Sequence, residues 1–405
     1  MKITNILRFH SMRVQLLSGL LIMLGSGQPL AVRAIQGRTV THQKSQNDFA
    51  RGVQLQQSGD LEGARQAYEA ALKWAPRRVD ALSNLGLVFS RMGQYEQAIQ
   101  LYLKALAIDP QLQLVRYQLA ATCFQAQKYE ASMEELKKVL LAQAANPQAR
   151  HLLAICLLKL NRLDEGIAEL EQVQVAHPEN LAMASTLGSA YITNQQLEKA
   201  AVLIEKTFNQ PTTAEAYLVR GSYNIAIADY RNAIEELSHA KELNPKLPTV
   251  RSQLGYAYWY IGDRGQGRQE FQAELEDNPL DFNANAFLGW LYREDGRLEE
   301  AAVLLKRAQQ LKPDDSGILL QLAGLAQSRG LKGEALNLLE RAVKQKPDCT
   351  PAHVLLAQMY FRLKRTTEAR REREIIDRLN AEEQSRQPST HDRQDRYTGI
   401  SVPPR

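Results

Sequence analysis

The stretch of sequence that decides the fold reads ALSNLGLVFSRMGQYEQAIQLYLKALAIDP, from Ala81 to Pro110. It contains two amphipathic segments, separated by a glycine-containing turn at Gly93 and ended by the proline. Gly86 in the first segment and Ala98 in the second are small, and two helices approach closely only where side chains are small. The stretch therefore predicts a pair of packed antiparallel helices.

The same pattern recurs along the chain every 34 residues, except for one step of 33 residues between Gly188 and Gly221. With Gly86 as the origin, a small residue stands at each equivalent position: Gly52, Gly86, Ala120, Ala154, Gly188, Gly221, Gly255, Gly289, Ala323 and Ala357. Twelve residues after each origin a second small residue follows: Ala64, Ala98, Ser132, Gly166, Ala200, Ala233, Gly267, Ala301, Ala335 and Ala369. A period of this length is typical of a solenoid, in which hairpins stack because one hairpin alone cannot bury both of its faces.

Two further features repeat with the same period. Sixteen residues after the origin, nine of the ten residues are large and apolar, Tyr102 among them, and the exception is Arg373. Proline stands 24 residues after the origin at seven of the nine junctions between repeats, because proline ends a helix. At the other two junctions the proline is displaced, to Pro147 and Pro211.

These features together resemble the tetratricopeptide repeat family. The motifs that carry the resemblance are Leu85-Gly86-x-x-Phe89, Leu187-Gly188-x-x-Tyr191, Leu254-Gly255-x-x-Tyr258 and Leu288-Gly289-x-x-Tyr292. The resemblance implies an all-α fold, a right-handed α-α superhelix of about ten helix-turn-helix repeats over residues 45–383. In the sixth repeat, Arg220 and Asn224 stand where apolar residues are expected, so we expect a local bend or looser packing there.

The two ends of the chain differ from the repeats. Residues 1–34 combine three early basic residues, an apolar run of about 12 residues from Val14 to Gly25 and a Val32-Arg-Ala34 site, which is typical of a cleaved signal peptide. The run is shorter than the ~20 residues that span a bilayer as a helix, although an uncleaved membrane anchor is the alternative. Residues 35–44 are expected to form a short flexible lead. Residues 384–405 contain little apolar material and are expected to be disordered.

Composition and motifs argue against several function classes. The net charge is +5, but four basic residues and no acidic residue lie in 1–34, so the remainder is nearly neutral and lacks the clustered charge of a nucleic-acid-binding protein. The sequence contains no phosphate-binding loop, no nucleophile elbow and no histidine pair at metal-ligand spacing. We therefore expect no catalytic residues, no metal and no cofactor. Cys123 and Cys156 are interpreted as buried apolar residues, with a disulfide as the alternative.

In the first helix of each repeat, positions −3, +1, +4 and +5 from the origin point away from the hairpin core. The family resemblance implies that these positions line a concave groove where extended peptides or partner segments bind. Tyr256, Trp259 and Tyr260 occupy three of them in the seventh repeat and Trp290 occupies one in the eighth, so Tyr256 and Trp290 are expected to be neighbours. Tyr117 and Phe124 form a smaller candidate patch in the third repeat. Mutual packing of these rings, as a purely structural cluster, is the alternative interpretation.

The sequence therefore predicts an exported, non-catalytic scaffold that binds a protein or peptide partner in its groove. Two alternatives stay open: a membrane-anchored factor for assembly or secretion at the cell envelope, and a regulatory subunit of an envelope enzyme. For the last of these, the aromatic residues would contact a glycan. The oligomeric state and the identity of the partner do not follow from the sequence.

Overall fold

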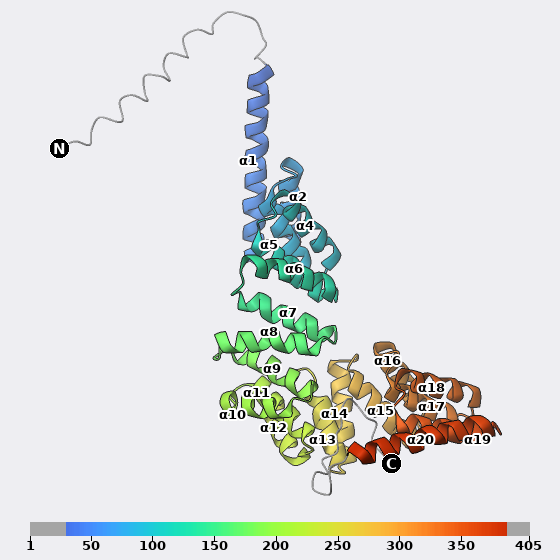
Figure 1. The fold of residues 1–405 in the computed structure, drawn as a ribbon. Coiled ribbons are helices and arrows are strands. Elements are labelled where there is room, and N and C mark those ends of the chain that lie inside the picture. The colour runs from blue at the N-terminus through green and yellow to red at the C-terminus, as the bar shows by residue number, and fades with distance from the viewer. Residues whose placement is uncertain (1–29, 387–405) are drawn as a thin grey trace, which may run out of the picture. The chain divides into compact units, whose positions relative to one another are not determined.

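The computed structural model describes residues 30–386, and these residues form helices and turns without any strand. The chain divides into two compact units, residues 1–149 and 150–405, which are described separately (Figure 1). The predicted signal peptide at 1–34 and the predicted disordered tail at 384–405 lie outside the described residues, apart from 30–34 and 384–386. No described helix combines the length and the apolar character that crossing a bilayer requires.

In the first unit, each helix from α1 to α5 packs against the one that follows it. The helices are α1 (Leu30–Gln57), α2 (Leu61–Trp74), α3 (Val79–Arg91), α4 (Tyr95–Ile108), α5 (Gln113–Gln125) and α6 (Tyr129–Ala142), followed by α7 (Pro147–Lys159), which crosses the boundary between the units. The pairs α1–α2, α3–α4 and α5–α6 are the predicted hairpins, and α2–α3 and α4–α5 contacts stack them.

The second unit continues the same order. Its helices are α8 (Leu163–Ala176), α9 (Leu181–Thr193), α10 (Leu197–Thr207), α11 (Ala214–Ala226), α12 (Tyr230–Leu243), α13 (Val250–Tyr260), α14 (Arg264–Asp277), α15 (Phe282–Glu294), α16 (Leu298–Leu311), α17 (Ser316–Ser328), α18 (Lys332–Gln345), α19 (Thr350–Arg362) and α20 (Thr366–Arg386). Every origin residue lies in an odd-numbered helix and every second small residue in an even-numbered one. The predicted all-α fold of stacked helix pairs is therefore confirmed.

The small residues perform the predicted role at the helix crossings. A Cβ atom on Gly86 would lie 2.9 Å from the ring of Tyr102, and one on Gly255 would lie 2.8 Å from the ring of Phe271. Both rings are fully buried, as is Ala98. The aromatic residue sixteen positions after the origin therefore fills the space that the missing side chain leaves.

The turn inside each hairpin requires one residue with a positive φ angle. Gly93 adopts this conformation at φ 74°, which glycine does without steric cost. In the sixth repeat the same place is taken by Ala228 at φ 60°, a conformation that residues with a side chain rarely adopt.

Residues 35–44, expected to form a short flexible lead, are helical in the structure and belong to α1. The segment contains no proline, so each further residue adds one hydrogen bond to a helix that is already nucleated by packing. That packing begins at Ser45, which is fully buried and donates a hydrogen bond to the carbonyl of Ala71 at 3.0 Å.

Candidate functional site

The groove positions of the seventh and eighth repeats lie on two neighbouring helices. α13 and α15 are the first helices of these repeats and contact each other directly. α13 carries Tyr256, Trp259 and Tyr260, and α15 carries Trp290. All four side chains are half-buried, so each ring keeps part of its surface in solvent.

The two tryptophans form one contact between these helices. The ring centroids of Trp259 and Trp290 are 4.5 Å apart and the ring planes are almost perpendicular, which is a favourable edge-to-face arrangement. The guanidinium of Arg264, at the start of α14, lies 4.6 Å from the ring centroid of Trp259. This cation–π contact places a positive charge beside the tryptophan pair.

The tyrosines form a second group with two residues that the sequence analysis missed. Tyr260 stacks on Tyr230 of α12 at 4.6 Å and lies 4.7 Å from Tyr256. Tyr256 meets the ring of Phe287 on α15 edge to face at 5.4 Å. Phe287 is buried, so the group is anchored in the core. Tyr230, Tyr256, Trp259, Tyr260, Phe287 and Trp290 are called the aromatic cluster below.

Tyr256 and Trp290 were the expected neighbours across α13 and α15. In the structure Trp290 meets the ring of Trp259, and Tyr256 meets that of Phe287. Tyr230 and Phe287 were missed for a simple reason. They do not occupy groove positions of the repeat register, and only the packing of α12 and α15 against α13 brings them into the cluster.

Tyr117 and Phe124, both on α5, have different surroundings. Tyr117 lines a cavity of about 300 Å³ beside α6, and burial raises the pKa of its hydroxyl. Phe124 packs against Tyr129 at 5.5 Å in an edge-to-face contact. Both side chains are half-buried.

Phe361 on α19 is a further aromatic residue of the groove register that the sequence analysis passed over. Its side chain is 66% exposed, more than any residue of the aromatic cluster. It stands four residues after the origin Ala357, the same position as Trp259 and Phe124 in their repeats. Reading this one position through all ten repeats would have found it.

Three buried acids, Glu270, Glu274 and Asp281, lie on α14 and at the start of α15. Glu270 pairs with Lys241 at 2.6 Å, and Asp281 accepts hydrogen bonds of 2.7 Å from the hydroxyl of Ser252 and the amide of Ala284. Glu274 is only 4% exposed. Burial raises the pKa of Glu274, and the negative charge of Asp281 raises it further.

We predict that Glu274→Gln stabilises the second unit at neutral pH, by about 1 kcal/mol, the scale of one buried polar group without full compensation. A raised pKa means that the folded state binds the proton more tightly than the unfolded chain does, so stability falls as pH rises through the folded-state pKa. Glutamine carries no charge and still accepts the hydrogen bond from Asn278. Urea unfolding between pH 4 and pH 8 should show a gain that grows with pH; a gain independent of pH would contradict the explanation.

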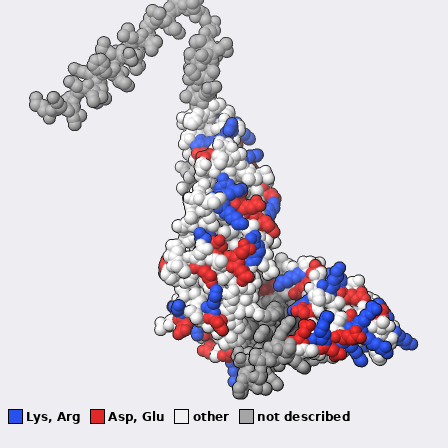
Figure 2. All heavy atoms as spheres, in the orientation of Figure 1, with Lys and Arg blue, Asp and Glu red and all other residues white. Residues whose placement is uncertain are grey.

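The surface over the described residues is of mixed charge. Figure 2 shows basic and acidic side chains interspersed on the visible face, without a continuous basic stripe. Among residues 30–386, no group of three or more His, Cys, Asp or Glu side chains is placed to hold a metal ion. The arrangement at α13 and α15 brings together apolar rings, one cation and tyrosine hydroxyl groups.

Models of the tetratricopeptide repeat match the sequence at residues 52–93, 79–112, 124–178, 214–247, 252–316 and 333–387, which together span more than half of the chain. The chain belongs to the tetratricopeptide repeat family. The matches fall on the same helix pairs that the structure shows, and tetratricopeptide arrays generally act as non-catalytic scaffolds that bind other proteins.

The curated relatives share only part of their length with this tetratricopeptide protein. Protein O-mannosyl-transferase TMTC3 of Homo sapiens is 29% identical over 135 residues, which cover 31% of this chain and 15% of the relative. Superkiller complex protein 3 of Homo sapiens is 30% identical over 98 residues, which cover 24% of this chain and 6% of the relative.

Two solved structures show a partial similarity to this chain. The Cut9–Hcn1 hetero-tetramer of the APC/C has a TM-score of 0.47 and 13% identity, covering 84% of this chain and 87% of that chain. PilF of Pseudomonas aeruginosa has a TM-score of 0.43 and 17% identity, covering 56% of this chain and 98% of that chain.

Proposed function

We propose that this tetratricopeptide array is a non-catalytic scaffold that binds a protein or peptide partner through the aromatic cluster on α13 and α15. The observation that carries the proposal is the Trp259–Trp290 pair, which stands at groove positions with both rings partly in solvent. A tryptophan that gives up its remaining exposed surface to a partner contributes strongly to affinity, and interface hot spots are enriched in tryptophan and tyrosine for this reason.

The packing of the rings on one another favours this role because it fixes their positions before binding. A partner then loses less conformational entropy when it contacts them, since the side chains are already ordered. Arg264 beside Trp259 adds one positive charge at the edge of the surface, so the proposal favours a partner segment that combines apolar residues with a nearby acid.

We predict that Trp259→Ala and Trp290→Ala each lower the affinity for the partner about thirtyfold, which corresponds to the ~2 kcal/mol of a hot-spot residue. The partner is first captured with the wild-type chain from the native host and identified by mass spectrometry, and its affinity is then measured by isothermal titration calorimetry. Trp74→Ala is the matched control, since Trp74 lies on α2, is 42% exposed and stands outside the groove register.

Circular dichroism must show that the variants stay folded, because both rings also contact the core. Unchanged affinity in both folded variants would exclude the aromatic cluster as the binding surface. Loss of affinity for a glycan and not for a protein would support the regulatory-subunit alternative instead.

We also propose that the protein is exported and that the signal peptide is removed after Ala34. The support is the order of basic residues, short apolar run and small residues in 1–34. Mass spectrometry of the mature protein should find Ile35 at the N-terminus. A mature chain that keeps residues 1–34 and fractionates with membranes would favour the anchored alternative.

A further inference from the structure

Two cavities occur at the two junctions where the proline is displaced from its regular position. One, of about 300 Å³, includes Gln143, Asn146 and Gln148 in its lining, around Pro147. The other, of about 320 Å³, includes Asn209, two residues before Pro211. Each lies within one unit, the first between α5 and α6 and the second between α10 and α11. Arg220 and Asn224, around which a local bend or looser packing is expected, both line the second cavity.

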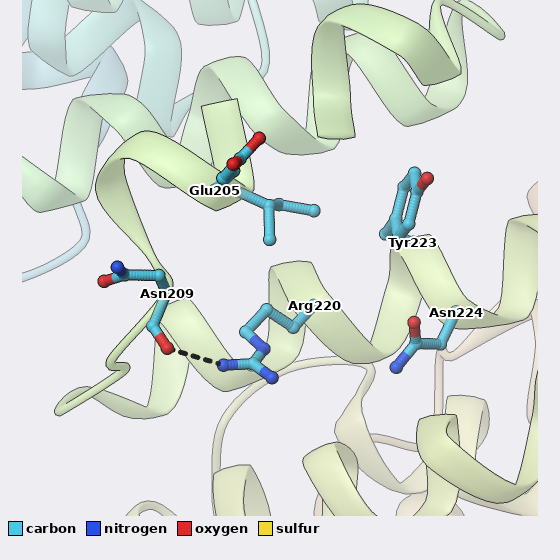
Figure 3. Close-up of a pocket in the computed structure, with 6 residues that line it drawn as sticks. Glu205, Asn209, Arg220, Tyr223 and Asn224 are labelled. Atoms are coloured by element: carbon cyan, nitrogen blue, oxygen red, sulfur yellow. Dashed lines mark hydrogen bonds between the residues drawn. The ribbon is translucent and has the colours of Figure 1, made fainter. Parts of the chain in front are cut away.

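Arg220 lines the second cavity and is held in place by hydrogen bonds and an ion pair within the protein. One guanidinium nitrogen donates to the carbonyl of Phe208 at 3.3 Å and to that of Asn209 at 3.4 Å, the second of which is drawn in Figure 3. A second nitrogen lies 2.5 Å from the carboxylate of Glu236. The positive charge is thus already balanced by a half-buried acid. Glu205, also in the lining, points its carboxylate away from Arg220.

Apart from the exposed carboxylate of Glu205, the groups that remain available in this cavity are uncharged and polar. The side-chain carboxamides of Asn209 and Asn224 and the hydroxyl of Tyr223 form no hydrogen bond with another described residue. A carboxamide offers both donors and an acceptor. Ile204 adds an apolar wall. An anionic ligand would meet no uncompensated cation, because Arg220 is paired with Glu236, whereas an uncharged group that both donates and accepts would be satisfied by the carboxamides of Asn209 and Asn224.

The first cavity repeats this chemistry with different residues. No charged side chain lines it. The carboxamide oxygen of Gln113 is buried and has no partner among the described residues, and Gln148 stands free at the rim. Asn146 is already used, since it donates to Gln143 at 3.1 Å and accepts from the amide of Ala149 at 2.9 Å. The two cavities are formed by different helices, yet each places free carboxamides beside one tyrosine and aliphatic side chains.

We propose that each junction cavity binds main-chain amide groups of an extended polypeptide segment. A peptide unit carries one donor and one acceptor, which a single carboxamide can satisfy together. A saccharide of similar size presents more hydroxyl groups than the free carboxamides can satisfy, and those left over would lose their hydrogen bonds to water. The inference rests on the proposed function, because it requires a polypeptide partner. It places the backbone of that partner at two sites that lie outside the groove positions of the repeats.

The test uses the full chain labelled with ¹⁵N in asparagine and glutamine side chains, and N-acetylglycine N-methylamide as the probe. Saturable shifts of the Asn209 and Gln113 side-chain signals are expected, with a dissociation constant in the millimolar range for so small a ligand. Asn224→Leu should weaken binding at Asn209 at least fivefold. Gln113→Leu should leave the Asn209 response unchanged and abolish the response of Gln148.

Asn224→Leu is expected to fold, because the equivalent positions of other repeats carry large apolar residues such as Phe89 and Tyr191. Methyl β-glucoside is the comparison ligand. Shifts caused by the glucoside alone, by neither compound, or by the amide without sensitivity to Asn224→Leu and Gln113→Leu would overturn the proposal. Trp259→Ala with Trp290→Ala should leave the amide response intact, so failure of the proposed groove site is distinguished from failure of these cavities.

Discussion

Phe271→Ala is expected to lower the free energy of unfolding of the second unit by about 4 kcal/mol, as truncation of a buried aromatic residue does. Phe271 lies on α14 and is completely buried. Its ring stacks on Phe287 of α15, with centroids 5.4 Å apart and planes within 6°, and it fills the space over Gly255 of α13. The void would therefore touch three helices of two repeats, and none of them can close it alone.

Urea unfolding followed by tryptophan fluorescence measures this effect, because Trp259 and Trp290 lie on the two helices that Phe271 joins. Val303→Ala on α16 is the control, since Val303 is 57% exposed and should change stability by less than 0.5 kcal/mol. A loss of under 1 kcal/mol for Phe271→Ala would mean that neighbouring repeats hold the fold without this ring.

Gly267→Val is expected to destabilise the same unit by about 3 kcal/mol, the upper range for an overpacked site. A Cβ atom on Gly267 would lie 3.0 Å from the backbone carbonyl oxygen of Gly255 and 3.5 Å from the backbone nitrogen of Trp259. Backbone atoms cannot move aside as side-chain ends do, so α13 and α14 must separate to admit the branched side chain.

Gly267→Ala is the matched comparison for this site. Seven of the other repeats carry alanine at the same position, and alanine in a helix is favoured over glycine by about 1 kcal/mol. We therefore expect Gly267→Ala to be close to neutral, as its helix preference offsets one tight contact. Equal thermal denaturation midpoints for the valine and alanine variants would show that the crossing of α13 and α14 is looser than the structure indicates.

The helix pairs were predictable because their cause is local and repeated. All ten repeats carry two small residues twelve positions apart, such as Gly86 with Ala98 and Gly255 with Gly267. Each repeat therefore supports the interpretation of the others. The register also indicated which face of α13 and α15 carries aromatic residues. It could not indicate that Trp259 would meet Trp290, because ring contacts depend on rotamers and on the distance between two repeats.

The helical conformation of residues 35–44, in contrast, was not predictable from local sequence. Their sequence carries no repeat signal, and their helical state depends on α1 being held against α2 through Ser45. Tyr230 entered the aromatic cluster in the same way, through the packing of α12 beside α13.

The sequence alone determined the fold class, the length and order of the hairpins, the helix crossings and the face on which the tryptophans stand, because a 34-residue period constrains every repeat through short-range contacts. Only the tertiary structure decided which rings touch, how Arg220 is neutralised by Glu236, and that cavities open where Pro147 and Pro211 are displaced. These features arise between neighbouring helices and repeats, where side-chain volumes and hydrogen bonds from several segments must be satisfied together.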